Sequence, residues 1–525
     1  PPITWSLPGI LAERAALTPQ DECLIDAITD ERITYRTLQE EAGRLGQGLK
    51  GLGIEAGDTI ATMITHSIDT YRVWFGLTHI GVLEVPIGVK FKGRLLGHLL
   101  EDSGAKAIII DADFLEVLRP VLENEPLPDL RWVVVRGASG EVEALDPREV
   151  LTLEEVGRAG ETAADGTDSD PWDRAPHELA MVLYTSGTTG PSKGVLVPWG
   201  QVGSVAAGVY PEGTHKAGDI LYCPFPPNHI GGRLLPAVGI RHGLPVVIRE
   251  TWSASAFWPE IHRHGCTTTA MVSAMANILW RSPASDTDAD NPITNLLLLP
   301  VIDEYEQFEE RFGLRICTTF NMTEISIATQ SGWGIEDPRS CGKARLGPPG
   351  YQLRLVDEHD YPVEVGEVGE LVVRTDVPWS LNAGYFGRPQ QTAEAWRNGW
   401  FHTGDAFKCD EEGRYYFVDR MKDAIRRRGE NVSSFEVERE VSDHPDVVEC
   451  AAIGVPAAIG EEDIKVFVVT TPGSELTEAE LIEHVGEKCA PFMVPSYVEF
   501  VDELPKTEAT ERVKKAELRT HEAGH

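Results

Sequence analysis

A loop rich in glycine and hydroxyl groups, directly after an apolar run, carries the clearest chemical pattern in the sequence. Residues 183–195 read Leu-Tyr-Thr-Ser-Gly-Thr-Thr-Gly-Pro-Ser-Lys-Gly-Val, and the run Leu179 to Tyr184 is apolar enough for a buried strand. Glycines let backbone N–H groups approach an anion, hydroxyls add donors, and Lys193 adds a compact charge. A flexible surface loop is the alternative, which so many donors beside a buried strand disfavour. The residues expected to bind phosphate are Thr185, Ser186, Gly187, Thr188, Thr189, Gly190 and Lys193.

The order of residues differs from a Walker-type loop, which has Gly-x-x-x-x-Gly-Lys-Ser/Thr, because Pro191 and Ser192 precede Lys193 here. The loop closely resembles that of the AMP-forming adenylating enzymes, which include acyl-CoA synthetases, aryl-CoA ligases and luciferases. This resemblance covers essentially the whole chain, since the phosphate, ribose and hinge motifs follow in family order and spacing. It implies that the loop binds ATP, with catalytic roles for Thr185 and Lys193.

A carboxylate stands beside hydroxyl groups in residues 318–324, Thr-Thr-Phe-Asn-Met-Thr-Glu. Such a carboxylate suits a hard cation that bridges phosphates, although a Thr-Glu pair also begins helices. The resemblance implies that Phe320 covers adenine, Thr323 contacts the α-phosphate and Glu324 holds a catalytic Mg²⁺. The family usually has Tyr-Gly where this chain has Phe320-Asn321. The remaining nucleotide-binding residues of the segment are Thr319, Asn321 and Met322.

Asp405 follows a glycine in Trp-Phe-His-Thr-Gly-Asp, residues 400–405. An ionised carboxylate accepts hydrogen bonds from both hydroxyls of a ribose, although a solvated loop aspartate is the commoner case. The family has Thr-Gly-Asp at this place with the aspartate on the ribose, so the resemblance gives Asp405 that role. Gly384-Tyr385 also matches a family segment, which we interpret as structural.

A charged run at residues 419–431 is either a solvated linker or, by resemblance, the family hinge. The resemblance implies that Arg420 reaches the ribose, that Lys422 is the pivot of a mobile C-terminal domain, and that Gly429 lines the pantetheine tunnel of CoA. The following residues 430–438 resemble the carnitine/crotonobetaine–CoA ligase branch especially.

The acid pocket and the C-terminal lysine loop are less regular. His229 lies in Pro-Pro-Asn-His-Ile-Gly-Gly, where relatives place an aromatic-His pair that lines the acid pocket; a structural histidine is the alternative. The family lysine in Pro-x-Thr-x-x-Gly-Lys bridges the acid and the α-phosphate. Here residues 505–512 read Pro-Lys-Thr-Glu-Ala-Thr-Glu-Arg, so that Glu511 or, with one insertion, Arg512 takes its place. Arg512 keeps the charge, and Lys506 is a weaker catalytic substitute. Residues 296–306 also replace a Gly/Ala-rich turn beside the pocket.

The sequence alternates between helical and strand-like patterns, and the helices and strands that these patterns predict must position the motifs. Helices are expected at residues 38–52, 68–81 and 478–488, and strands at 58–63, 105–110, 131–135, 220–224, 245–248, 268–272, 295–299, 315–319, 352–356, 370–373, 451–455 and 465–469. A polar loop is expected at 161–173. The alternation predicts an α/β fold with largely parallel sheets. By resemblance this is a large N-terminal AMP-binding domain (1–420) of layered αβαβα sheets plus a β unit, and a small mobile α+β C-terminal lid domain (421–525).

Composition limits the partners and the compartment. The chain has 525 residues and a formal net charge of −36, which argues against nonspecific nucleic-acid binding and against anionic membranes. Its eight cysteines contain no Cys-x-x-Cys pair, which fits reduced thiols in the cytoplasm. We expect no signal peptide at the start of the sequence and no spanning helix, since no stretch approaches about 18 apolar residues.

The resemblance implies that a small acid attacks Mg-ATP to give an acyl-AMP and pyrophosphate, and that CoA thiol then displaces AMP. One alternative keeps the adenylate but changes the acceptor, as in amide-forming ligases or a nitrite-using diazotase of aryl amines. Another is an adenylate-binding protein without turnover, which Glu511 motivates. The identity of the acid stays open, and a homodimer is neither required nor excluded.

Overall fold

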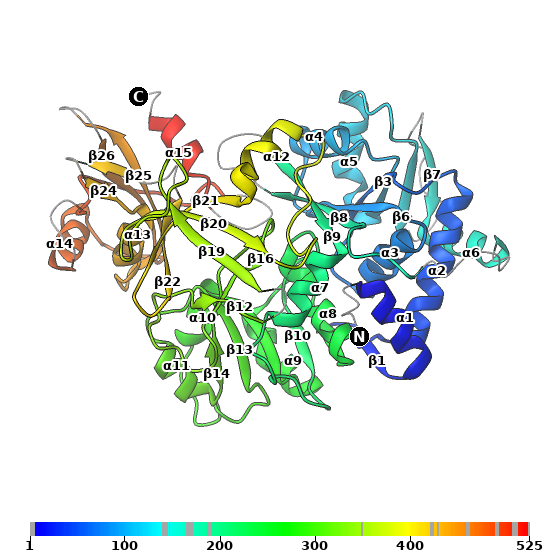
Figure 1. Ribbon diagram of the computed structural model, residues 1–525, viewed down its shortest axis with the longest axis horizontal. Coiled ribbons are helices and arrows are strands. Elements are labelled where there is room, and N and C mark those ends of the chain that lie inside the picture. The colour runs from blue at the N-terminus through cyan, green and yellow to red at the C-terminus, as the bar shows by residue number, and fades with distance from the viewer. Residues whose placement is uncertain are drawn as a thin grey trace. The chain divides into compact units, whose positions relative to one another are not determined.

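The computed structural model describes residues 6–138, 145, 148–163, 172–185, 192–347, 350–420, 425–427, 430–457, 462–488, 493–506 and 513–522. The chain forms two compact units (Figure 1). Of the described residues, the larger contains those within Pro1–Thr185, Ser192–Gln352 and Arg374–Glu394, and the smaller contains those within Leu353–Val373 and Ala395–His525. The division expected from the sequence, 1–420 and 421–525, stays a prediction.

A seven-stranded sheet in the larger unit has the order β14-β13-β12-β10-β11-β1-β2 and is parallel apart from the β1–β2 pair. Its strands are β1 (Glu22–Asp26), β2 (Arg32–Thr34), β10 (Leu221–Cys223), β11 (Val246–Ile248), β12 (Thr268–Val272), β13 (Asn295–Leu299) and β14 (Arg315–Cys317). Successive side chains alternate between its two faces. Leu221 and Cys223 join one core, with α1 (Leu7–Leu17) and α8 (Ile230–His242), whereas Tyr222 joins the core of α9 (Ala254–His264), α10 (Ser273–Trp280) and α11 (Tyr305–Phe312).

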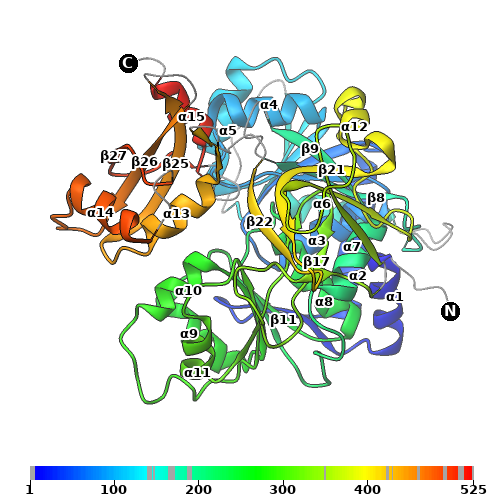
Figure 2. The same cartoon turned by 60° about the vertical axis from the view of Figure 1, so that its left-hand side comes forward.

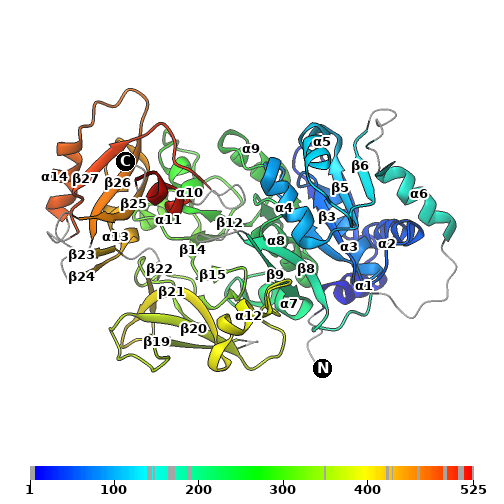
Figure 3. The same cartoon turned by 90° about the horizontal axis from the view of Figure 1, so that it is seen from above.

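A second seven-stranded sheet of this unit has the order β7-β6-β5-β3-β4-β8-β9, and only β8–β9 is antiparallel. Its strands are β3 (Thr59–Met63), β4 (Leu83–Pro86), β5 (Ala107–Asp111), β6 (Trp132–Arg136), β7 (Glu149–Thr152), β8 (Leu179–Thr185) and β9 (Lys193–Pro198). Helices line both faces (Figure 3), which explains why every residue of the central strands β3 and β5 is buried. These helices are α2 (Tyr35–Gly51), α3 (Ile68–His79), α4 (Gly93–Ser103), η1 (Ala112–Phe114), α5 (Leu115–Asn124), α6 (Leu153–Ala163) and α7 (Trp199–Gly208).

One core connects the two large sheets. It contains buried residues of β1, β10 and β11 from the first sheet, of β8 and β9 from the second, and of α3, α7 and α8 between them. The resulting helix and sheet layers are the αβαβα arrangement expected from the sequence. Short paired strands complete the larger unit: β15 (Asn321–Met322) with β16 (Ser326–Ile327), and β17 (Thr329–Gln330) with β18 (Lys343–Ala344).

A four-stranded sheet has the order β19-β20-β21-β22, and β20, β21 and β22 pair antiparallel. Its strands are β19 (Tyr351–Val356), β20 (Gly369–Thr375), β21 (Phe401–Cys409) and β22 (Tyr415–Arg420). The helices α12 (Pro389–Ala395) and η2 (Arg397–Gly399) precede β21.

The end of the chain forms a small α/β layer (Figure 2). Its sheet, β25 (Val447–Pro456), β26 (Glu462–Thr470) and β27 (Tyr497–Phe500), shares one core with α13 (Ser434–Ser442) and α14 (Glu478–Lys488), and another with α15 (Lys515–Glu522). The hairpin β23 (Ile425–Arg427) and β24 (Glu430–Val432) precedes it. No helix in the described part of the chain is long and apolar enough to cross a membrane.

Candidate active site

The β8–β9 hairpin places the two ends of the predicted phosphate loop opposite each other. Thr185 pairs with Lys193 across the hairpin, and the Thr185 hydroxyl donates to the Lys193 carbonyl at 3.4 Å. The Lys193 ammonium lies 5.3 Å from the centroid of the Tyr385 ring, within the range of a cation–π interaction. Residues 186–190 of the loop lie outside the described residues.

Glu324 lies in the tight turn that joins β15 to β16. The Ile325 N–H donates to the Met322 carbonyl at 3.2 Å, and Ser326 adopts a φ of 60° to close the turn. The Tyr385 hydroxyl donates to Oε1 of Glu324 at 3.1 Å, and Glu324 as a whole is 7% exposed. Lys193 and Glu324, distant in sequence, therefore contact the same tyrosine.

Three further side chains hold the backbone of this turn. The Gln201 amide, fully buried on α7, donates to the Thr323 carbonyl at 2.7 Å. The Tyr351 hydroxyl donates to the Ile325 carbonyl at 3.0 Å, and the Asn382 amide donates to the Glu324 carbonyl at 2.9 Å. The turn is thus held from several sides, which fixes the point from which the Glu324 side chain departs.

The other predicted nucleotide residues lead into this turn. Thr319 is buried and its hydroxyl donates to the Thr329 carbonyl, while the Phe320 N–H donates to the Thr329 hydroxyl at 2.8 Å. Phe320, Asn321, Met322 and Thr323 are half-buried. The segment is therefore anchored through Thr329 and presents partly accessible side chains.

A single carboxylate such as that of Glu324 suits a magnesium ion that arrives with a nucleotide. The described residues contain no group of three or more His, Cys, Asp or Glu side chains arranged to hold a metal. Mg²⁺ is commonly bound by one or two carboxylates together with substrate phosphates and water, rather than by a protein cage. Burial, together with the neighbouring Glu324 carboxylate, raises the pKa of Tyr385 well above its usual range, so its hydroxyl stays protonated and donates.

The predicted ribose residues lie in the smaller unit. Asp405 on β21 pairs with Arg420 on β22, and the Arg420 Nε lies 3.4 Å from Oδ1 of Asp405. Asp405 is 3% exposed, and Gly404 before it has a φ of 72°.

Glu370 on β20 holds this turn. Its carboxylate accepts from the Gly404 N–H at 3.0 Å and lies 2.9 Å from Nδ1 of His402. Burial by itself would raise the pKa of Glu370, but the contacts with His402, Gly404 and Arg397 lower it below its usual value. Glu370 therefore remains an anionic acceptor for the N–H of Gly404, the residue before Asp405.

The remaining predicted residues have other contacts or lie outside the described residues. His229 caps α8, because its Nδ1 accepts from the Gly231 N–H at 3.1 Å. Lys506 forms an ion pair with Glu449 at 2.9 Å. Lys422, Gly429 and Arg512 are outside the described residues.

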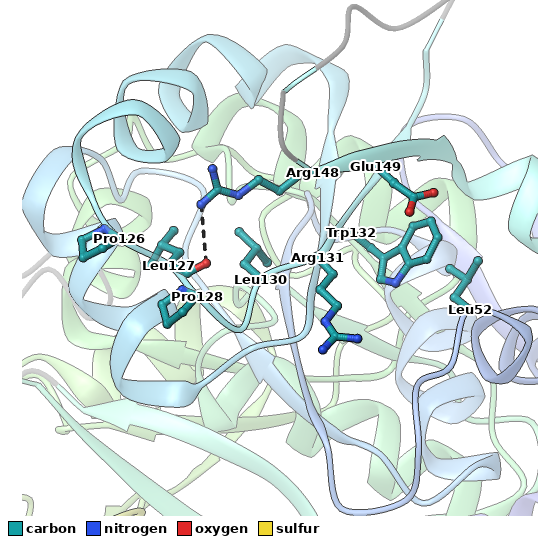
Figure 4. Close-up of a pocket in the computed structure, with 9 residues that line it drawn as sticks. All are labelled: Leu52, Pro126, Leu127, Pro128, Leu130, Arg131, Trp132, Arg148 and Glu149. Carbon is teal, nitrogen blue, oxygen red and sulfur yellow. Dashed lines mark hydrogen bonds between the residues drawn. The ribbon is translucent and has the colours of Figure 1, made fainter.

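A surface hollow of about 570 Å³ lies elsewhere, at the amino ends of β6 and β7 (Figure 4). Arg131, Trp132 and Arg148 are among the residues that line it. The Arg148 guanidinium donates to the Leu127 carbonyl at 3.5 Å. Ligands of parallel α/β sheets bind outside the carboxyl ends of the strands, so this hollow is not our candidate site.

Comparison with known proteins identifies the family. The sequence profile of the AMP-binding enzyme matches residues 11–386, and that of the AMP-binding enzyme C-terminal domain matches residues 436–510. The chain belongs to the AMP-binding enzyme family. It is 31% identical to a crotonobetaine/carnitine–CoA ligase of Citrobacter koseri over 496 residues, 92% of each chain, and 30% identical to that of Salmonella typhimurium, again with 92% coverage of each.

Solved structures share the fold of this AMP-binding enzyme. An anthranilate CoA ligase in complex with anthranoyl-AMP matches with a TM-score of 0.85 at 24% identity, covering 100% of this chain and 98% of the other. An o-succinylbenzoate CoA synthetase of Bacillus subtilis with ATP and magnesium matches with a TM-score of 0.81 at 23% identity, covering 98% of this chain and 99% of the other.

These findings confirm the predicted family and the α/β architecture with a smaller C-terminal domain. They also confirm, at the level of the family, an AMP-forming acid–thiol ligase, and they do not favour the amide-forming, diazotising or non-catalytic alternatives. The roles given to individual residues stay predictions. The supporting residues Tyr385, Gln201 and Glu370 are not predicted from the sequence. The match of Gly384-Tyr385 to a family segment is the one available signal, and by itself it indicates a structural role.

Proposed function

We propose that this enzyme is an ATP-dependent acid–CoA ligase that works in two steps. The carboxylate oxygen of a small acid attacks the α-phosphorus of ATP, and pyrophosphate leaves. The sulfur of CoA then attacks the acyl carbon, AMP leaves, and the thiol proton is released to solvent. The observation that supports this most directly is the approach of Lys193 and Glu324 to one tyrosine, in a chain 31% identical to crotonobetaine/carnitine–CoA ligases over 92% of its length.

In this proposal the loop between β8 and β9 and the β15–β16 turn bind the phosphates. Lys193 and the N–H groups of residues 186–190 neutralise and orient the β- and γ-phosphates, and Thr185 adds a hydroxyl donor. Glu324 would hold Mg²⁺, which would supply positive charge that offsets the negative charge of the phosphates. Thr323 contacts the α-phosphate and Phe320 covers the adenine. Catalysis is then positioning and charge stabilisation, without a covalent enzyme intermediate.

The smaller unit supplies the remaining groups in this proposal. Asp405 accepts from the ribose hydroxyls, with Arg420 beside it. Arg512 acts on the acid and the α-phosphate during adenylation in place of the family lysine. Lys422 is the hinge at which residues 421–525 move between the two steps, and Gly429 lines the path of the CoA pantetheine.

For the acid itself we propose a small molecule admitted near His229. Residues 296–306 replace the Gly/Ala-rich turn that relatives have beside the pocket, so we expect the shape of the pocket to differ from theirs. Carnitine-like acids are the first to test because the relatives named above act on them, followed by short aliphatic and aryl acids.

Pyrophosphate release from Mg-ATP tests the proposal. Each acid is assayed with and without CoA, and products are identified as acyl-AMP or acyl-CoA by mass spectrometry. Turnover that needs CoA for product release, and that is lost in Glu324→Gln, is the expected result. Turnover with an amine or with nitrite and an aryl amine, in the absence of CoA, would instead assign a different acceptor.

A further inference from the structure

Tyr385 contacts both charged groups to which we assign the phosphates and the magnesium ion. Its hydroxyl donates to Oε1 of Glu324 at 3.1 Å, and its ring centroid lies 5.3 Å from the Lys193 ammonium. Lys193 begins β9 and Glu324 lies in the β15–β16 turn. One side chain therefore contacts two groups that would act on the same triphosphate.

The backbone that carries Tyr385 is fixed on both sides. The Leu196 N–H donates to the Gly384 carbonyl at 2.9 Å, and the Phe386 N–H donates to the Gly194 carbonyl at 2.7 Å. Residues 384–386 therefore pair with β9 in the antiparallel direction, like a short additional strand. The Tyr385 N–H donates to the Thr392 hydroxyl at 2.9 Å. Tyr385 therefore has little freedom to withdraw from Glu324.

The position before Tyr385 accepts only glycine. Gly384 has a φ of 114°, and a Cβ there would lie 2.6 Å from the Thr392 methyl group. The same segment also binds the β15–β16 turn directly, since the N–H and the side-chain amide of Asn382 both donate to the Glu324 carbonyl at 2.9 Å. Residues 382–386 thus hold Glu324 at two points, because Asn382 binds the Glu324 main-chain carbonyl and Tyr385 binds the Glu324 carboxylate.

A hydrogen bond to a metal-binding carboxylate restricts the rotation of that carboxylate. Groups that orient metal ligands in this way typically contribute about 10- to 100-fold to metal affinity. The aromatic face acts differently on Lys193, because it attracts the ammonium without neutralising it.

We propose that Tyr385 is a positioning residue for the metal–nucleotide complex: its hydroxyl orients Glu324 toward the divalent cation, and its ring holds Lys193 at the phosphates. The inference rests on the proposed binding of Mg-ATP by Glu324 and Lys193. It assigns a function to a residue that the sequence pattern alone marks only as structural.

Binding of Mn²⁺ to the enzyme with a non-hydrolysable ATP analogue, followed by electron paramagnetic resonance, tests this without turnover. In Tyr385→Phe the hydroxyl is lost and the ring is kept, so the dissociation constant for Mn²⁺ should rise about 10- to 100-fold. The affinity for the analogue without metal should change less than about threefold. In Tyr385→Leu the ring is lost as well, and metal-free analogue binding should also weaken.

Two controls separate positioning from general damage. Tyr222→Phe removes a hydroxyl that donates to a carboxylate, Glu260, at 2.8 Å in the same unit, and it should leave Mn²⁺ affinity unchanged. In a Glu324→Gln background, Tyr385→Phe should have no further effect on Mn²⁺ binding, because the residue acts through Glu324. Melting temperatures of all variants identify any that fail to fold.

The outcomes distinguish the inference from the function on which it rests. If the wild-type enzyme binds no Mn²⁺–nucleotide complex, the proposed ATP site and the inference are both wrong. If the wild type binds it and Tyr385→Phe binds it equally well, only the inference is overturned. An equal loss in Tyr222→Phe, or an undiminished effect in the Glu324→Gln background, would also overturn it.

Discussion

The buried ion pair between Glu84 and Arg233 allows a quantitative test of what holds the two α/β layers of the larger unit together. Glu84 is on β4 and is 0% exposed; Arg233 is on α8 and is 1% exposed. The Arg233 Nη2 donates to Oε1 of Glu84 at 2.7 Å, and the Thr62 hydroxyl donates to the same oxygen at 2.7 Å. In the described part of the chain, Oε2 of Glu84 and Nη1 of Arg233 have no hydrogen-bond partner.

The expected magnitude follows from this geometry. Arg233→Met leaves a buried carboxylate without its cation, which costs about 3–5 kcal/mol. Replacing both charges in Glu84→Met/Arg233→Met removes that penalty. What remains is the loss of the bond from Arg233 Nε to the Pro227 carbonyl at 2.8 Å and of the Thr62 bond, each worth about 1 kcal/mol. The cation–π contact of Arg233 with the Trp74 ring, whose centroid lies 4.8 Å away, is lost in Arg233→Met and in the double variant alike. The double variant should therefore be more stable than Arg233→Met.

The instability of Arg233→Met should depend on pH. Burial raises the pKa of Glu84 above its usual value, and Arg233 opposes this, so removing Arg233 raises it further. A carboxyl group with a raised pKa in the folded state is protonated there while ionised in the unfolded chain, and stability falls as pH rises from about 4.5 toward that raised pKa. In the wild type, burial and secondly Arg233 lower the pKa of His66 to about 3, so it is neutral from pH 5 to 8. Burial, the larger of these two causes, remains in Arg233→Met.

Thermal unfolding at pH 5 and pH 8 measures these effects. We expect the melting temperature of Arg233→Met to lie further below that of the wild type at pH 8 than at pH 5, and the double variant to show no such difference. A pH-independent deficit in Arg233→Met, or a double variant less stable than Arg233→Met, would refute the reasoning.

The remaining predictions concern activity. Glu324→Gln should reduce pyrophosphate release at saturating ATP about 100-fold or more, because the charge facing the metal is lost; an unchanged rate would exclude its proposed role. Glu370→Ala should weaken ATP binding about 10- to 100-fold without changing Mg²⁺ dependence, since a hydrogen bond to a charged group contributes about 1.5–3 kcal/mol; isothermal titration measures this, and a shift in Mg²⁺ dependence would contradict it. Arg512→Lys should retain acyl-AMP formation, whereas Arg512→Ala should lose about 100-fold in single-turnover assays; equal rates would assign the role elsewhere.

The regular elements were predictable because burial leaves a periodic pattern in the sequence. The strands at residues 268–272 and 295–299 have the expected bounds as β12 and β13. The helix expected from residue 38 begins earlier, at Tyr35, because the Thr34 hydroxyl caps it by accepting from the Thr37 N–H at 3.3 Å. The polar segment expected as a loop from residue 161 still contains the end of α6 at Ala163.

The supporting contacts of the site were not predictable in the same way. Tyr385 and Glu324 are 61 residues apart, and no local pattern relates a Gly-Tyr pair to a Thr-Glu turn. Glu84 interrupts an apolar run and would be expected at a surface, yet its partner Arg233 lies 149 residues away. Such pairs depend on which strands and helices become neighbours, and the local patterns from which elements are predicted do not show that.

The acidity of the chain gives a physical reason for an aromatic neighbour at Lys193. The chain has 83 acidic and 47 basic side chains, so most Lys and Arg side chains are expected to form an ion pair with a carboxylate. Lys506 pairs with Glu449 in this way, and Arg420 pairs with Asp405. Among the described residues Lys193 forms no ion pair, and the Tyr385 ring lies beside it instead. A cation–π contact contributes only about 0.5–1 kcal/mol at an accessible site. It therefore orients the ammonium but leaves its charge available, which is what binding a triphosphate in a strongly anionic protein requires.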